Sequence, residues 1–67
     1  MPNYYIARQL ADKSRTYLDT CWRFYPELYQ NDTAKTQEFT DLSYALMIAG
    51  ELDAIVLTEG VGCLVPV

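Results

Sequence analysis

The chain has 67 residues, and a chain of this length is expected to form one domain spanning residues 1–67. Its composition is 51% hydrophobic and 13% aromatic, which predicts a folded protein and argues against a disordered one. The net charge of −4 argues against a general nucleic-acid-binding protein, because such a protein needs a positive field.

The charge is unevenly distributed along the chain. Residues 1–25 contain four Lys or Arg against two Asp, which gives a net charge of +2. Residues 26–67 contain one Lys against seven Asp or Glu, which gives −6. We therefore expect the two parts to attract each other, within one chain or between chains.

The first predicted element is a helix over residues 3–25. Asn3 is a suitable N-cap, and Pro26 is expected to end or kink the helix. Charged residues spaced four apart, such as Arg8 with Asp12, are expected on the solvent-facing side. The opposite side is a stripe with alternating spacings of three and four. Its members are Ala7, Leu10, Ser14, Tyr17, Cys21, Phe24 and Leu28.

A second helix is predicted over residues 33–49, capped by Asp32 or Thr33. Gly50 is expected to take the left-handed conformation that stops it. Its apolar stripe again follows the helical period. The stripe consists of Phe39, Leu42, Leu46 and Ala49.

The last fourteen residues carry a single charge, Glu59, and favour a β-hairpin or strand over about residues 54–65. A turn at Glu59 and Gly60 would place Thr58 opposite Val61. A short helix over residues 51–58 is the alternative. We expect this apolar tail to be covered by the rest of the chain or by a second copy, as a homodimer. The residues expected to be buried there are Ile55, Val56, Leu57, Val61, Leu64 and Val65.

These elements predict a mainly α fold, a helical hairpin with a C-terminal β-hairpin or strand, completed by homodimerisation. The chain has no His and only two Cys, which excludes the usual nucleophile pairs and a tetrahedral zinc site. Cys21 and Cys63 fall in apolar surroundings and are interpreted as buried thiols in a reducing compartment. No catalytic residue, metal ligand or cofactor site is predicted, so we expect a protein that is not an enzyme.

Aromatic and arginine residues gather in the first part of the chain and indicate a contact surface for a larger protein, since Trp, Tyr and Arg dominate binding hot spots. The candidate partner-binding residues are Arg15, Trp22, Arg23, Tyr25 and Tyr29. The preferred hypothesis is a small cytoplasmic inhibitor or antagonist of a larger bacterial protein, of the kind that phages and mobile elements carry, acting by surface occlusion.

Two alternatives remain open at this point. One is a precursor peptide with a helical leader and an apolar core at residues 57–67 that an enzyme modifies. The other is an antitoxin-like or DNA-associated regulator that contacts phosphates through Arg8, Arg15 and Arg23, although the net charge disfavours nucleic acid. Neither a secretory signal nor an apolar run of membrane-spanning length is expected.

Overall fold

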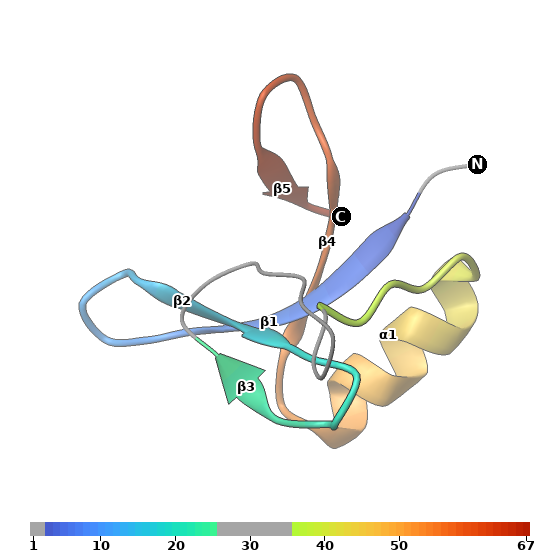
Figure 1. Cartoon of the computed structure of the whole chain (residues 1–67), viewed down its shortest axis with the longest axis horizontal. Helices are drawn as coiled ribbons and strands as arrows, with labels where there is room; N and C mark the ends of the chain where they lie inside the picture. The colour runs from blue at the N-terminus through green and yellow to red at the C-terminus, as the bar shows by residue number, and fades with distance from the viewer. Residues whose placement is uncertain (1–2, 26–35) are drawn as a thin grey trace.

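The computed structural model describes residues 3–25 and 36–67, which form one antiparallel sheet and one helix (Figure 1). The sheet has five strands in the order β3-β2-β1-β4-β5. In chain order the elements are β1 (Tyr4–Gln9), β2 (Arg15–Leu18), β3 (Phe24–Tyr25), α1 (Leu42–Glu51), β4 (Ile55–Glu59) and β5 (Leu64–Pro66). The central strand β1 thus joins the β1–β2–β3 meander to the C-terminal hairpin of β4 and β5.

Each face of the sheet buries its own set of side chains. Successive residues of a strand point to opposite faces, so Ile6 packs on one side of β1, and Tyr5 and Ala7 pack on the other. The Ile6 side packs against α1, which lies along β1 and β4 (Figure 1). The core on this side consists of Ile6, Leu18, Phe39, Ala45, Ala49 and Val56.

The second face is covered mainly by the curl of the sheet itself. Tyr5, Ala7 and Leu57 are buried there, with Tyr17 and Leu64 packed around them. Arg15 Nη1 donates a hydrogen bond to the Leu64 carbonyl oxygen at 3.4 Å, although β1 and β4 separate β2 from β5 in the sheet. The two sides of the sheet therefore approach each other over this second, smaller core.

Helix α1 has defined ends. The Asp41 side chain caps its start by accepting hydrogen bonds from the backbone N–H groups of Ser43 and Tyr44. At the other end the Ala54 N–H bonds to the Ala49 carbonyl at 2.8 Å, and Asp53 takes the left-handed conformation with φ 53°. This pattern is a Schellman motif, and it turns the chain directly into β4. The prediction that Gly50 takes the left-handed conformation is wrong, because Gly50 lies within α1 and Asp53 takes that conformation.

The predicted mainly α fold is wrong, and with it the helical hairpin. Residues 3–25 form three strands and contain no helix. The apolar residues of this segment can have a spacing of three and four in a strand meander as well. Two five-residue turns separate the strands, so the in-and-out alternation of one strand does not continue into the next. The segment contains four Tyr and two Thr, which pack well on a pleated sheet and outweigh the helical pattern.

The second predicted helix is also misplaced. Helix α1 starts at Leu42 and ends at Glu51, whereas Thr36 and Phe39 make single bridge pairs with Asp19 and Tyr4. Phe39 belongs to the same core as α1 but reaches it from an extended segment. The predicted start of that helix, and Pro26, lie outside the described residues.

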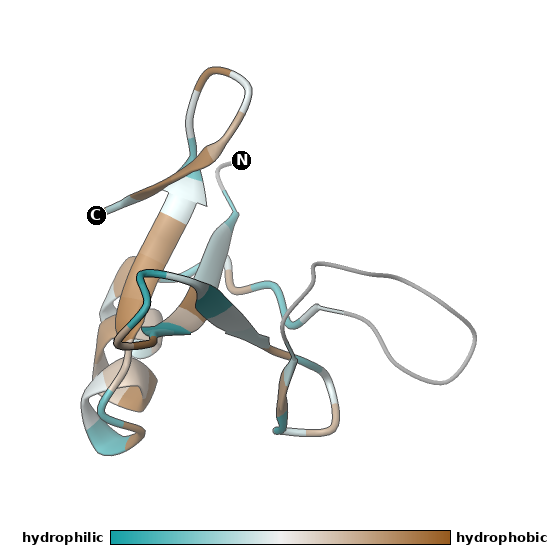
Figure 2. Ribbon diagram, turned by 90° about the vertical axis from the view of Figure 1, so that its left-hand side faces the viewer, coloured by the Kyte–Doolittle hydropathy of each residue, from teal (hydrophilic) through white to brown (hydrophobic). Residues whose placement is uncertain are grey.

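The tail forms two paired strands, but with a register that differs from the expected one. Glu59 pairs with Leu64 and Thr58 with Val65, so residues 60–63 form the loop. Gly62 supplies the positive φ of 77° that the loop needs, a role the sequence analysis had not given it. Hydropathy along the ribbon shows the apolar character of β4, whose residues Val56 and Leu57 enter the two cores (Figure 2). None of the helices in the described part of the chain is long and apolar enough to cross a membrane.

Candidate binding site at the β2–β3 turn

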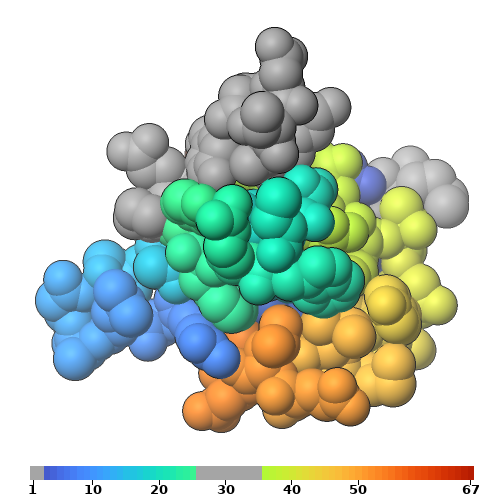
Figure 3. Space-filling view, turned by 60° about the horizontal axis from the view of Figure 1, so that its bottom comes forward, coloured from blue at the N-terminus to red at the C-terminus, as the bar shows by residue number. Residues whose placement is uncertain are grey.

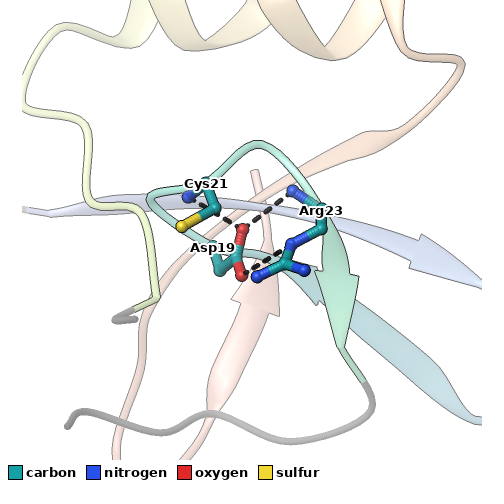
Figure 4. A network of polar contacts seen from close by, with 3 residues as sticks. All are labelled: Asp19, Cys21 and Arg23. Carbon is teal, nitrogen blue, oxygen red and sulfur yellow. Dashed lines mark hydrogen bonds and ion pairs between the residues drawn. The ribbon is translucent and has the colours of Figure 1, made fainter. Parts of the chain in front are cut away.

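The turn from Asp19 to Arg23 connects β2 to β3 and carries several chemically distinctive side chains. The Asp19 N–H donates to the Arg23 carbonyl at 2.8 Å, and the Trp22 N–H donates to the Asp19 carbonyl at 3.1 Å. Asp19 Oδ1 also accepts from the backbone N–H groups of Cys21 at 3.0 Å and Arg23 at 2.8 Å (Figure 4). Asp19 therefore forms hydrogen bonds with backbone groups along the whole turn, as Asp commonly does in turns.

Asp19 is 1% exposed and holds the turn from inside the protein. Its Oδ2 atom accepts no hydrogen bond among the described residues, and the nearest cation shown is Arg23, whose Nε lies 4.0 Å away (Figure 4). A buried carboxylate is costly unless it is paired and hydrogen-bonded. The cost of burying Asp19 is offset by the two hydrogen bonds that its Oδ1 accepts, which fix the backbone of the turn.

Trp22 is the second distinctive residue of the turn. Its φ is 63°, in the left-handed region, and its side chain is 53% exposed. Only glycine enters that region freely, and for a bulky residue such a φ is unusual and strained. Because about half of the indole is in solvent, packing within the chain accounts for only part of the tryptophan at this position.

Arg23 and Tyr25 extend the same surface. The Arg23 guanidinium lies 5.4 Å from the centre of the Tyr25 ring, a cation–π distance. The pKa of Arg23 is raised, chiefly by electrostatic interaction with Tyr25, so the side chain stays cationic. In the space-filling view, the green surface of the turn and β3 lies at the front, between the blue β1–β2 turn and the orange end of α1 (Figure 3).

The structure brings together three of the five predicted partner-binding residues: Trp22, Arg23 and Tyr25. Arg15 is directed elsewhere, since its guanidinium bonds to the Leu64 carbonyl. Tyr29 lies outside the described residues. The site is therefore a compact turn rather than the helix face that the sequence predicted.

The six tail residues also separate into groups. Val56 and Leu57 are buried within the chain, and Leu64 is half-buried. Ile55, Val65 and Val61 are exposed, Val61 completely. The two central residues of the tail are thus covered by this chain alone.

Asp19 was not predicted as a site residue, because the charged residues of the first segment were expected on the solvent-facing side of a helix, and the prediction of buried Cys21 and Cys63 is wrong. Both thiols are exposed and neither is in a disulfide. A signal for the turn was present in the sequence: Asp12-Lys13-Ser14 in the first turn and Asp19-Thr20-Cys21 in the second both start with Asp, a residue that favours turns.

A separate polar cluster lies on the curled face of the sheet. The hydroxyl of Tyr5 lies 3.1 Å from Glu59 Oε1 and 3.2 Å from Glu38 Oε1. Burial, followed by the hydrogen bond to Glu59, raises the pKa of Tyr5 to about 12. The phenol therefore stays protonated and serves as a hydrogen-bond donor between two carboxylates.

The described residues contain no group of three or more His, Cys, Asp or Glu side chains that could hold a metal ion. Comparisons of the chain with protein-family models, with curated proteins and with solved structures find no match.

Proposed function

We propose that this protein is a non-enzymatic binding module that attaches to a larger protein through Trp22 at the tip of the β2–β3 turn. The observation that carries this proposal is the exposed tryptophan in a left-handed backbone conformation. A glycine would be more favourable for the fold at that position. A large, rigid, exposed aromatic ring has its main use in contact with another molecule.

The charge around the turn suggests the chemistry of the partner. Arg23 carries a positive charge at the turn, and the Arg8 guanidinium lies over the ring of Phe24 in β3. A partner surface with an apolar pocket for the indole and carboxylates near it would complement this end of the molecule. Inhibition by covering that surface, as phage and mobile-element inhibitors do, is the mode of action that we retain.

The alternatives have less support. A precursor peptide was expected to have a helical leader, but that segment is a strand meander, and Leu57 at the start of the supposed core peptide is buried. A DNA-associated regulator would have to overcome the net charge of −4. Homodimerisation stays a prediction, and it is less needed because Val56 and Leu57 are covered within the chain. We place the protein in the cytoplasm, since exposed thiols suit a reducing compartment.

The proposal is tested by affinity capture from host extract with three matched baits: the wild type, Trp22→Gly and Lys13→Gly. Lys13 has a left-handed φ in the other meander turn, so its replacement by Gly controls for the backbone change. We expect a protein that the wild type and Lys13→Gly retain and Trp22→Gly loses. Equal recovery of every captured protein by all three baits would remove Trp22 as the anchor.

A further inference from the structure

Arg8 connects the end of helix α1 to strand β3, which follows the β2–β3 turn. Its Nε atom donates a hydrogen bond to the Leu52 carbonyl oxygen at 3.0 Å, and its Nη2 atom donates to the same oxygen. The guanidinium carbon lies over the Phe24 ring, 4.5 Å from the ring centre. One side chain therefore contacts both the C-cap residue of α1 and the first residue of β3.

The strand register explains how Arg8 reaches these two groups. Arg8 follows Ile6 by two residues in β1, so its side chain leaves the face of the sheet that α1 covers. Arg8 pairs with Thr16 of β2, and two residues further along β2 Leu18 pairs with Phe24. Paired residues share a face, so the Phe24 ring lies on the α1 side and packs against the first core.

Helix α1 has other contacts that hold it in place. Its last turn is closed by the hydrogen bonds from the Ala54 N–H to the Ala49 carbonyl and from the Leu52 N–H to the Ile48 carbonyl. The first core joins the helix to β1 and β4. Strand β3, in contrast, has two residues and pairs with β2 alone among the described strands. The Arg8 contact thus adds most to the position of β3.

We propose that Arg8 is a positioning residue for the binding site at the β2–β3 turn. It holds Phe24 against the end of α1, and Phe24 fixes the strand that directly follows Trp22 and Arg23. A left-handed tryptophan persists only where the surrounding structure holds it. Asp19 holds the turn from inside, and Arg8 holds the strand on its far side. The inference rests on the proposed function, in which this turn is the binding surface.

Three substitutions separate the parts of the contact. Arg8→Gln keeps a donor for the Leu52 carbonyl but removes the charge, whereas Arg8→Lys keeps both a donor and the charge. Phe24→Leu keeps an apolar side chain in the core and removes the ring. A cation beside the C-terminus of a helix also stabilises the helix, which is the purely structural role that the test has to separate.

The test is amide hydrogen exchange in the full-length protein, followed by NMR. The turn is represented by the amides of Asp19 and Arg23, and the rest of the fold by those of Tyr4 and Phe39, which bond to each other's carbonyls. We expect Arg8→Gln to speed exchange about two- to fivefold more at the turn than at the reference pair. Arg8→Lys should restore most of the protection of the turn. In a Phe24→Leu background, Arg8→Gln should have little further effect on the turn.

Three results of the exchange measurement would overturn the inference. Acceleration by the same factor at both pairs of amides would show a general loss of stability. Equal effects of Arg8→Lys and Arg8→Gln would remove the charge from the argument. An undiminished effect of Arg8→Gln in the Phe24→Leu background would remove the ring. Should Arg8→Gln fail to fold by circular dichroism, Arg8→Lys and Phe24→Leu decide the question in the same measurement.

Affinity capture provides the binding readout, with Gln9→Ala as the control. Gln9 is the exposed neighbour of Arg8 and pairs with Arg15. We expect the Arg8→Gln bait to recover several-fold less of the Trp22-dependent protein than the wild type, and Gln9→Ala to recover as much. Full recovery by Arg8→Gln would refute the positioning role in binding. If no captured protein depends on Trp22, the proposed function fails, and the exchange measurement alone decides whether Arg8 positions the turn.

Discussion

Lys13 and Trp22 occupy equivalent positions in two turns of the same design. In the first turn the Leu10 N–H donates to the Ser14 carbonyl and the Lys13 N–H to the Leu10 carbonyl. In the second, the Asp19 N–H donates to Arg23 and the Trp22 N–H to Asp19. The two φ values are 72° and 63°. Lys13 can therefore serve as a control for substitutions of Trp22.

Replacing either residue by glycine should stabilise the fold. The left-handed conformation is free of steric penalty in glycine, and the gain is partly offset by the greater entropy of glycine in the unfolded chain. We expect the free energy of unfolding in urea to rise by about 0.5–1 kcal/mol for both Lys13→Gly and Trp22→Gly. A marked loss of stability in Trp22→Gly alone would mean that the indole is a structural residue.

Asp19 and Asp12 should differ sharply in their importance. Asp19→Ala removes a buried acceptor from two backbone N–H groups and should lower the free energy of unfolding by about 1–3 kcal/mol. Asp12 accepts from the Ser14 N–H and hydroxyl at the exposed first turn, so Asp12→Ala should cost less. Both values come from urea unfolding monitored by fluorescence.

Asp19→Asn provides the finer comparison. It retains an oxygen acceptor for the two N–H groups and removes the buried charge, so it should be less harmful than Asp19→Ala. Equal stability of the Ala and Asn variants would show that the hydrogen bonds to the turn contribute little.

Stability at alkaline pH should depend on Tyr5. Its pKa is raised from 10.0 to about 12, first by burial and then by the hydrogen bond to Glu59. Because the folded state holds the proton more tightly than the unfolded state, the contribution is complete below pH 10 and is lost as the pH rises toward about 12. Two pKa units correspond to about 2–3 kcal/mol, and we expect a smaller contribution because the Tyr5 hydroxyl bonds to exposed glutamates that water screens.

The measurement is the free energy of unfolding of the wild type and of Tyr5→Phe between pH 9 and about pH 12. The five other tyrosines are common to both proteins and form the background. The wild type should lose stability more steeply than Tyr5→Phe across this range. Parallel curves would show that the Tyr5 hydroxyl titrates normally.

The sequence predicted a mainly α fold, whereas the structure is mainly an antiparallel sheet. The stripe from Ala7 to Phe24 has a helical period, but each of the strands β1, β2 and β3 contains only one of its members, and the others lie in the turns. Only the pairing of Ile6 with Val56, fifty residues away in the chain, distinguishes the two, and such pairing is not visible in a local pattern. The four Tyr and two Thr of residues 3–25 were the signal for strands in this segment.

The place of a residue could be predicted where it depends on neighbours in the sequence, and could not where it depends on contacts with distant parts of the chain. The apolar pairing of the tail follows from its β-branched residues, whereas its register depends on Gly62 and the 60–63 loop. Trp22, Arg23 and Tyr25 were close in sequence and remain close, the first two in the turn and Tyr25 in the adjoining strand β3. Asp19 was missed because burial of a charge depends on the bridge to Thr36 and the layers around it.

The end of α1 provides the last prediction. Asp53 holds the left-handed position of the Schellman motif, where glycine is preferred, so Asp53→Gly should raise the free energy of unfolding by up to about 1 kcal/mol. Gly50→Ala should also be stabilising, by about 0.5–1 kcal/mol, because alanine favours the helix and its Cβ meets open space. Both values come from thermal and urea unfolding of single variants. If Gly50→Ala proved destabilising, the glycine would be needed by the helix itself.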